Sequence, residues 1–490
     1  MTDVTGTSDP GASAAAAGAA AAVRRAPAAY QAAVADLQRA YAAIPPGSPV
    51  RLAKRTSNLF RFSGGSRSAG LDVSAFGRVL RVDPQARTAL VGGMTTYEDL
   101  ADATLRHGLM PLVVPQLKTI TLGGAVTGLG IESSSLRSGM PHESVTEMEI
   151  LTGDGQVVTA SNGNEHAALY RGFPNSYGTL GYALSLTIEL EPAAPFVHLR
   201  HFRYDNADAC MAAIAQIAQD GSLSGHRADF VDGTVFAPDE MYLTVGAFSE
   251  VGPWLSDYTR ERIYYRSIRG PKEDFLTIRD YLWRWDTDWF WCSRAFGVQN
   301  PVIRRAWPRR YRRSDVYRRL VNLEQRYHVH AALNARRGHA PRENVIQDVE
   351  IPVERGAEFL RFFADRVGMS PVWMCPLRLR GANPGGRPPG SSREERPWPL
   401  YPLRAGQVYV NFGFWGTVAL PPGAADGHYN RQVEDEVTAL GGHKGLYSTS
   451  FYSEEEFSEL YNGPEYAKLK REYDPDGRLA SLYEKCVTFK

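Results

Sequence analysis

The stretch Thr121–Gly139 reads TLGGAVTGLGIESSSLRSG, and the interpretation of the whole chain begins there. It holds five glycines and four serines in nineteen residues, and its charged groups are Glu132 and Arg137. Glycine reaches positive φ without strain and lets backbone N–H groups approach an anion closely. The stretch is therefore either a flexible or structural glycine loop or a cradle for a phosphate.

Two common phosphate sites are disfavoured by the same residues. No lysine completes a GxxxxGK[ST] P-loop, which argues against an NTPase. No GxGxxG opens a helix after a strand, which argues against a Rossmann dinucleotide site. Residue types alone leave the choice between a structural loop and another kind of phosphate cradle open.

The chain as a whole has the composition of a globular protein. Its 490 residues are enough for two or three domains. The net charge of +1 means that an anionic partner must be met by a local patch. The four cysteines form no CxxC pair, so we expect reduced thiols in a cytosolic protein and no metal site. They are Cys210, Cys292, Cys375 and Cys486.

The N-terminal residues 1–26 are rich in alanine and lack basic residues before the alanine run. We expect a disordered tail there, because alanine is a poor substitute for the leucine-rich core of a signal peptide. The pattern that follows predicts an amphipathic helix over residues 28–43. No run of about 18 apolar residues occurs, so we expect no transmembrane helix.

Two regions with different residue patterns follow along the chain. Residues 50–192 alternate short β-runs with one capped helix that starts at Thr95 or Thr96 and ends at Gly108. A Pro-containing break at 192–195 leads into a second α+β region, which contains a Pro/Gly/Ser-rich loop over 381–399 that we expect to be mobile. The strands expected in the first region cover 51–54, 79–82, 88–92, 144–151, 156–159 and 183–190.

The glycine stretch also carries a resemblance to a known family. Residues 121–158, followed by GTLG at 178–181, resemble the FAD domain of the vanillyl-alcohol-oxidase superfamily. GIESSS looks most similar to the Δ24-sterol reductase-like branch. Further similarity lies in RTSNLFRFS (55–63), VIQDVEIPV (345–353), YVNFGFWG (409–416) and residues 446–470.

The resemblance implies an α+β fold with a two-subdomain, PCMH-type FAD-binding domain over 27–194. It implies an α+β substrate or cap domain over 195–460 and a C-terminal segment, 461–490, that returns to the FAD domain. The FAD contacts that it implies are Thr56, Ser57, Asn58, Thr121, Gly123, Gly124, Gly128, Gly130, Ile131, Glu132, Ser133, Ser134, Gly139, Gly178 and Gly181. For several of these glycines, plain turn geometry is the alternative.

One departure from the family affects how the flavin is held. Many members tether it covalently through a histidine or cysteine in the first loop. The corresponding sequence here, RTSNLFRFSGGSRS, contains neither, so we expect non-covalent FAD. His107 and His142 are expected to be surface or structural residues.

The chemistry implied by the resemblance requires a proton donor. Reducing an isolated C=C bond needs protonation of one carbon and hydride delivery to the other, in a pocket that excludes water. The candidate acids are Glu132, Tyr447 and Tyr452, with Lys444 a weaker one. Gln347, next to Asp348, is a candidate for orienting substrate or flavin. Ordinary packing or backbone hydrogen bonding is the alternative for each.

Residues 281–320 combine tryptophans with many arginines. Such a segment suits an anionic membrane surface, a buried aromatic cluster with a solvated arginine face, or, less well, a nucleic acid. We expect a cytoplasmic protein without nucleic-acid partners, and contact of 283–319 with the inner face of a membrane is one alternative. The oligomeric state is left open by the sequence.

The resemblance and the residues together predict a FAD-dependent reductase of an isolated C=C bond in a lipid, with NADPH as electron donor. The Ala/Arg-rich composition indicates a bacterial source with GC-rich DNA, which favours a methylene-branched, phospholipid-linked fatty acyl chain over a sterol. The alternatives are a sterol side-chain reductase, a flavin oxidase or dehydrogenase of a sugar or alcohol, and a flavin-bearing lipid-binding protein without turnover.

Overall fold

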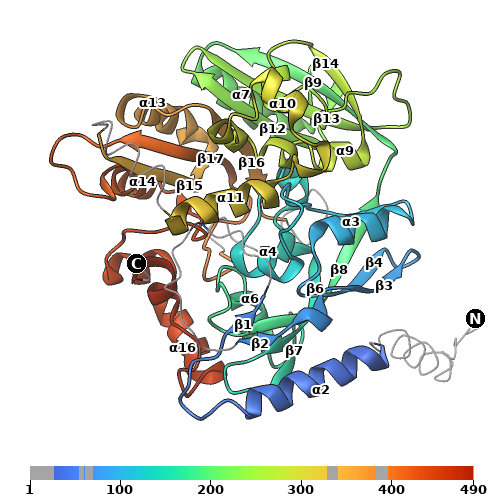
Figure 1. Ribbon diagram of the computed structural model, residues 1–490, viewed down its shortest axis with the longest axis vertical. Helices are drawn as coiled ribbons and strands as arrows, with labels where there is room; N and C mark the ends of the chain where they lie inside the picture. The colour runs from blue at the N-terminus through green and yellow to red at the C-terminus, as the bar shows by residue number, and fades with distance from the viewer. Residues whose placement is uncertain (1–26, 55–59, 61–69, 328–339, 381–395, 489–490) are drawn as a thin grey trace, which may run out of the picture.

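The structure, a computed structural model, describes residues 27–54, 60, 70–327, 340–380 and 396–488. Figure 1 shows two β-sheets with their helices, one above the other. The predicted tail, the predicted cofactor contacts Thr56, Ser57 and Asn58, and residues 381–395 of the predicted loop lie outside the described residues. The mixture of helices and sheets confirms the predicted α+β class.

The first domain is built on a six-stranded antiparallel sheet in the order β3-β4-β8-β6-β7, with β5 paired to β8. Its tight turns are held by aspartates: Asp83 accepts from the N–H groups of Gln85 and Ala86, and Asp154 accepts from that of Gln156. The strands are β3 (Val79–Asp83), β4 (Thr88–Gly92), β5 (Leu109–Pro111), β6 (Val145–Leu151), β7 (Val157–Ser161) and β8 (Tyr182–Pro192). These bounds confirm the predicted strands to within two residues.

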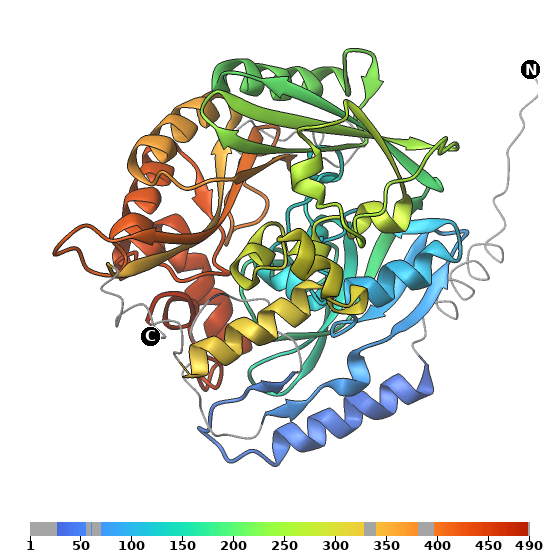
Figure 2. The ribbon, with the colours of Figure 1, turned by 45° about the horizontal axis from the view of Figure 1, so that its top comes forward.

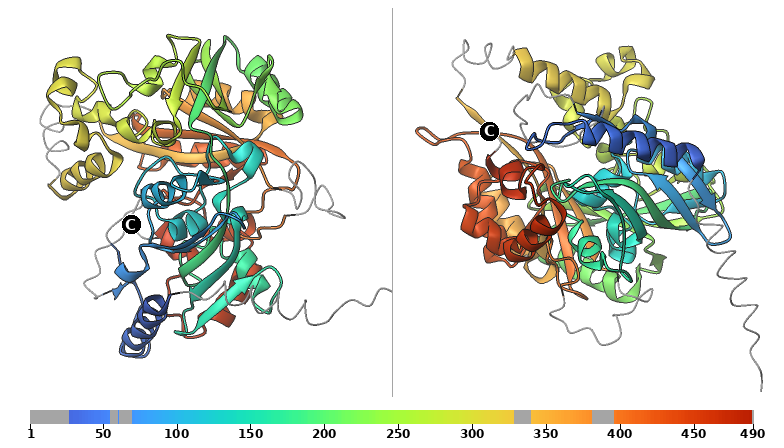
Figure 3. Two further views of the ribbon diagram at one scale, coloured as in Figure 1. Left: turned by 90° about the vertical axis from the view of Figure 1, so that its right-hand side faces the viewer. Right: turned by 90° about the horizontal axis from the view of Figure 1, so that it is seen from below.

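Helices of the first domain cover both ends of this sheet. Thr96 caps one of them by accepting from the N–H of Asp99, as the sequence predicts. The elements are α2 (Ala28–Ala42), α3 (Tyr97–Leu105), α4 (Leu122–Gly128), α5 (Ser135–Ser138) and α6 (Ala167–Gly172), with the turns η1 (Ser74–Phe76) and η2 (Pro141–Ser144) and the paired β1 (Leu52–Ala53) and β2 (Leu71–Asp72). Helix α4 lies between the two sheets, and α2 lies at the end remote from the second sheet (Figures 1 and 3).

The second domain is an eight-stranded antiparallel sheet in the order β14-β9-β13-β12-β16-β17-β15-β18. The chain passes into it between Pro192 and Phe196. The strands are β9 (Phe196–Tyr204), β12 (Phe230–Ala237), β13 (Glu240–Ser249), β14 (Glu273–Thr277), β15 (Arg342–Pro352), β16 (Val372–Arg378), β17 (Val408–Ala419) and β18 (His443–Lys444), with the small hairpin β10 (Ser222–Leu223) and β11 (His226–Arg227).

The two faces of this sheet have different partners. One face packs its apolar residues, such as Val349 and Phe412, with residues of α7 (Ala207–Asp220), α13 (Gly356–Arg366) and α14 (His428–Ala439). The opposite face, which we call the boundary face, contributes Trp373 and Leu377 to a core that continues into the first domain. Successive side chains of a strand point to opposite faces of the sheet. Whether a residue packs against the helices or toward the first domain therefore depends on its position in this alternation.

The segment between β14 and β15 lies over the boundary. Its elements are α8 (Tyr264–Ser267), α9 (Ile278–Leu282), α10 (Pro301–Ala306) and α11 (Ser314–Tyr327), with η3 (Asp286–Asp288), η4 (Cys292–Phe296) and η5 (Arg309–Tyr311). Figure 2 shows α11 crossing in front of both domains. Trp283, Trp285, Trp289, Phe290 and Trp291 are all buried, so the tryptophan-rich part of 281–320 is a buried cluster.

The C-terminal segment contacts the first domain. It comprises α15 (Glu454–Leu460), α16 (Gly463–Tyr473) and the π-turn η7 (Glu484–Thr488). The Gly153 N–H donates to the Tyr473 carbonyl at 2.7 Å, and the Lys470 ammonium donates to the Thr179 carbonyl at 2.9 Å. Figures 1 and 3 show this segment beside the lower sheet.

A buried ion pair attaches this segment to the second sheet. The Lys444 ammonium lies 2.9 Å from Glu434 Oε1, and both side chains are 0% exposed. The Glu434 carboxylate also accepts from the Phe451 N–H. Lys444, the weaker candidate acid, therefore lies in a charge pair between β18 and α14.

Removing this ammonium should destabilise the protein strongly. In Lys444→Met the Glu434 carboxylate loses its charge partner, and breaking a buried pair from one side costs about 3–5 kcal/mol. The control Arg361→Met removes an ion pair with Asp208 whose side chains are 58% and 72% exposed, which costs about 1 kcal/mol or less. Thermal and urea unfolding of both variants measures the difference, and equal losses would contradict the assignment.

Candidate active site

The glycine stretch folds into two short helices joined by a turn, so it is not a linker. Thr121 caps α4, because its hydroxyl accepts from the Gly124 N–H. A Cβ on Gly123 would lie 2.8 Å from the Gly93 carbonyl oxygen, and one on Gly124 would lie 2.8 Å from Thr121 Oγ1. The first glycines of the stretch are thus required by close packing of the protein on itself.

The turn after α4 has backbone donors that the protein does not use. Leu129 has φ +60°, an uncommon conformation for a side chain of its size. Within the described part of the chain, the N–H groups of Leu129, Gly130 and Ile131 donate to no acceptor. All three residues are half-buried, so these donors can meet a ligand that is rich in acceptors.

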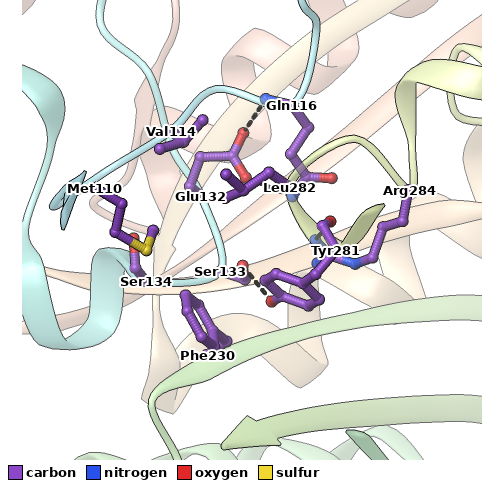
Figure 4. A pocket seen from close by; sticks show the side chains of 10 residues that line it. All are labelled: Met110, Val114, Gln116, Glu132, Ser133, Ser134, Phe230, Tyr281, Leu282 and Arg284. Carbon is purple, nitrogen blue, oxygen red and sulfur yellow. Dashed lines mark hydrogen bonds between the residues drawn. The ribbon is translucent and has the colours of Figure 1, made fainter. Parts of the chain in front are cut away.

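Glu132 follows this turn and is buried. Its Oε1 accepts from the Gln116 N–H at 2.7 Å, and its Oε2 accepts from the Gln116 side-chain amide. Figure 4 shows the carboxyl directed at Gln116, with Tyr281 and Arg284 of the second domain nearby. Burial raises the pKa of Glu132 well above its usual range, and the N–H donors of Gln116 oppose this only in part. Burial therefore favours the protonated, neutral form of Glu132.

The space beside Glu132 is small. The cavity that it lines with Met110, Phe230 and Arg284 has about 10 Å³ of water-accessible volume, which is roughly the space for one water molecule. A water there can carry a proton, but a substrate carbon does not fit. Glu132 can thus hold a proton beside this water-sized space. Its hydrogen bonds to Gln116 also stabilise the turn.

The serines that follow are occupied by protein partners. Ser133 Oγ lies 2.8 Å from the Tyr281 hydroxyl, and Ser134 Oγ donates to the Leu112 carbonyl at 2.8 Å. Ser135 Oγ accepts from the Glu132 N–H. These hydroxyls hold the turn, and Ser133 joins it to the second domain.

The remaining glycines of the prediction have local structural reasons. Gly139, Gly178 and Gly181 have positive φ, and a Cβ on Gly139 would collide with the Glu143 carboxyl. A Cβ on Gly128 would lie 3.2 Å from the Tyr177 ring, and the Tyr177 hydroxyl donates to the Gly128 carbonyl. Tyr177 therefore covers the end of α4.

The second domain presents two neighbouring acid groups, Asp348 and Tyr447, at the boundary face. The Trp415 indole N–H donates to the Tyr447 hydroxyl at 2.8 Å, which leaves the hydroxyl proton available to another acceptor. Asn411 Nδ2 donates to Asp348 Oδ1 at 3.2 Å. Burial raises the pKa of Asp348 to about 7, although the hydrogen bonds from Asn411 and Tyr447 lower it.

Two contacts place this pair beside the first domain. The Phe60 N–H donates to the Tyr447 carbonyl at 2.9 Å, and Phe60 belongs to the predicted first phosphate loop. The rings of Phe60 and Tyr447 also pack edge-to-face with their centres 5.9 Å apart. Burial and the Asp348 charge raise the pKa of Tyr447 well above its usual range. Tyr447 therefore lies against Phe60 of the first loop.

Two other candidates lie elsewhere. Gln347 is on the face opposite Asp348, where its amide donates to Asn430 Oδ1 of α14 at 2.7 Å. Tyr452 packs near Tyr461 and has the Arg431 guanidinium 5.7 Å from its ring centre. The structure separates both from the Asp348–Tyr447 pair. Of these two neighbours in β15, Asp348 faces the boundary and Gln347 does not.

His142 and His107 are a structural and a surface residue, respectively. His142 is 1% exposed and packs edge-to-face on Trp398 with ring centres 4.5 Å apart. Burial lowers its pKa to about 3, so it is neutral. His107 is exposed at the end of α3.

Comparison with known proteins agrees with this geometry. Residues 28–161 match a family model described as an FAD binding domain. The chain carries an FAD-binding domain. It is 25% identical to the Δ24-sterol reductase of Mus musculus over 68% of this chain and 61% of that protein. It is 25% identical to the Δ24-sterol reductase of Arabidopsis thaliana over 86% of this chain and 77% of that protein.

These similarities confirm the predicted superfamily and its Δ24-sterol reductase-like branch. The Δ24-sterol reductase homologue of Caenorhabditis elegans is 22% identical over 60% of this chain. The chain spans about 61% of the length of the mouse and rat relatives that it matches.

The FAD domain has groups that fit the cofactor. The three unused N–H donors of Leu129–Ile131 suit the acceptor atoms of a flavin or a phosphate. They lie in the half-buried turn between α4 and Glu132, beside Tyr177, whose hydroxyl donates to the Gly128 carbonyl. These residues and the predicted contacts of the first loop would hold FAD at the domain boundary.

The raised pKa of Glu132 makes a prediction about stability and pH. A carboxyl whose pKa is higher in the folded state takes up a proton on folding. Its stabilising contribution is present below its unfolded pKa and is lost as pH rises toward its folded pKa. Relative to the wild type, Glu132→Gln should therefore gain stability as pH rises from about 5 to 8.

Glu98→Gln serves as the control of opposite sign. Burial raises the pKa of Glu98, but Arg313 and Lys118 outweigh it, so the pKa is lowered overall. This variant should lose stability relative to the wild type as pH rises through the acidic range. Thermal midpoints across the same pH series measure both, and parallel curves for the two variants would refute the raised pKa of Glu132.

Proposed function

We propose that the protein is a FAD-dependent reductase of an isolated C=C bond in a lipid, with electrons from NADPH and with FAD bound non-covalently. The observation that carries this is the Asp348–Tyr447 pair, two neighbouring acid groups on the boundary face that lie against Phe60 of the first loop. Similarity to Δ24-sterol reductases supports the same class of reaction.

The reaction needs one proton and one hydride. Bound FAD, once reduced, supplies the hydride. No carbonyl polarises an isolated alkene, so its less substituted carbon must take a proton as the hydride reaches the more substituted one. For a methylene group, R₂C=CH₂ plus H⁺ and H⁻ gives R₂CH–CH₃. The protein must therefore hold an acid and exclude water.

The residues of the boundary supply the acid. Tyr447 donates its hydroxyl proton to the alkene, and the neighbouring Asp348 carboxyl returns a proton to Tyr447. A pKa of about 7 lets Asp348 carry that proton near neutral pH. Trp415 orients the Tyr447 hydroxyl, and Phe290 packs on Trp415 with ring centres 4.4 Å apart, which helps to exclude water.

For the substrate, we propose a methylene-branched fatty acyl chain carried on a phospholipid. The Ala/Arg-rich composition indicates a bacterial source, in which such chains are a more common lipid alkene than sterols. A sterol side chain is the second candidate, because the relatives named above are sterol reductases. Both alkenes require the same acid and the same hydride.

Variants of the acid pair should separate protonation from flavin reduction. Tyr447→Phe and Asp348→Asn should slow product formation from the alkene on the order of 10²–10⁴-fold, the range of general acid catalysis. Flavin reduction by NADPH should stay near the wild-type rate. Rapid-mixing absorbance measures both half-reactions, with Tyr452→Phe as a matched control that keeps activity. A full rate in Asp348→Asn would remove Asp348 from the mechanism.

The substrate class can be tested with the purified holoenzyme. Under anaerobic conditions NADPH should bleach the flavin, and a methylene-branched phospholipid should restore its absorbance with one methyl-branched product per turnover. A sterol with a side-chain alkene is the parallel substrate. Oxygen consumption with polyols, without alkene reduction, would establish an oxidase instead. Binding of the lipid without reoxidation would establish a binding protein.

A further inference from the structure

Helix α10 and the turn η5 form a short surface hairpin with apolar residues on its outside. Val302 is 77% exposed, Ile303 43% and Tyr311 43%, which places them among the most exposed large apolar side chains of the described residues. Asn300 caps the helix by accepting from the N–H groups of Val302 and Ile303. Figure 3 shows this yellow segment at the outer edge of the molecule in both views.

The same hairpin buries arginines. Arg304 is 1% exposed, and its guanidinium pairs with Asp288 at 2.7 Å and donates to the carbonyl of Arg262. Arg312 is 6% exposed and donates to the carbonyls of Thr259 and Trp307. The usual amphipathic order is therefore inverted: hydrogen-bonded arginines fix the hairpin from within, and its aliphatic residues face outward.

Further arginines surround the exposed apolar group. Arg305, Arg309 and Arg310 are exposed, and the Arg310 guanidinium lies 4.8 Å from the centre of the Tyr311 ring. Arg305 has one exposed partner, Glu261. Within the described part of the chain, Arg309 and Arg310 form no ion pair. The hairpin thus combines net positive charge with aliphatic and aromatic side chains.

Three kinds of partner can be compared by whether they suit both the positive charge and the exposed apolar side chains. A nucleic acid would pair with the arginines but would leave Val302 and Ile303 in water. A second copy of the chain, with net charge +1, offers no overall charge complement. An anionic bilayer accepts aliphatic and tyrosine side chains at the level of its headgroups and attracts arginine.

We propose that the α10–η5 hairpin docks on an anionic phospholipid bilayer, with Val302 and Ile303 entering the headgroup region and Arg309 and Arg310 contacting lipid phosphates. The buried tryptophans of 283–291 take no part. This docking concerns the surface to which the protein binds, and it does not depend on whether a lipid is the substrate. Among the described residues no helix is long and apolar enough to cross a membrane.

The test is co-sedimentation of the FAD-loaded protein with vesicles of phosphatidylcholine, with and without phosphatidylglycerol. The wild type should bind the anionic vesicles, and added salt should weaken binding. Val302→Ser with Ile303→Ser, and separately Arg309→Glu with Arg310→Glu, should each weaken binding by about tenfold or more. Flavin absorbance and thermal midpoints check that each variant is folded.

Matched controls make the outcome specific. The exchange Val302→Ile with Ile303→Val keeps the apolar surface and should keep binding. Arg106→Glu with Arg171→Glu makes the same charge change at exposed positions of the first domain and should weaken binding far less. Equal binding to neutral vesicles, or equal losses in both charge variants, would overturn the proposal. So would a change in oligomeric state in the serine variant with vesicle binding intact.

Discussion

The buried ion pair between Arg284 and Asp232 is the interaction on which the domain boundary depends. Their side chains are 1% and 2% exposed and lie 2.7 Å apart. Asp232 Oδ2 also accepts from the Trp285 indole, while the Arg284 guanidinium lies 3.9 Å from the centre of the Tyr281 ring. Since Tyr281 meets Ser133 of the glycine stretch, one charge pair connects the aromatic cluster to the turn after α4.

From this pair an aromatic path leads to the proposed acid. Trp285 stacks on Phe290, Phe290 packs on Trp415, and Trp415 donates to Tyr447. The rigid rings fix the position of the Tyr447 hydroxyl better than a flexible side chain would. The tryptophan-rich segment therefore acts as the support of the site, which explains why it is buried despite the arginines beside it in the sequence.

Much of the fold follows from the sequence, but the orientation of site residues follows only in part. Strand bounds in the first domain are predictable, because turn residues such as Asp83 and Asp154 mark them. The pattern of β15 also contained an unused signal. Gln347 is in phase with Val345, Val349 and Ile351, so strict alternation assigns it to the apolar, helix-covered face and Asp348 to the other. The arrangement in α10, with arginine buried and aliphatic residues exposed, has no comparable signal in the sequence. It depends on backbone carbonyls that residues distant in the sequence supply.

The boundary face also shows why its carboxyls are expected to be neutral. Glu350 is 1% exposed, and neither of its oxygens has a hydrogen-bond partner within the described structure. Burial raises its pKa well above the usual range, as it does for Glu132, and Asp348 adds to the shift. A buried carboxylate without a partner costs far more than a buried carboxylic acid, so protons replace counter-ions along this face. Three carboxyls that can hold protons between two domains are of little use to a protein that only binds a flavin, whereas a reaction that consumes one proton per turnover requires such a supply.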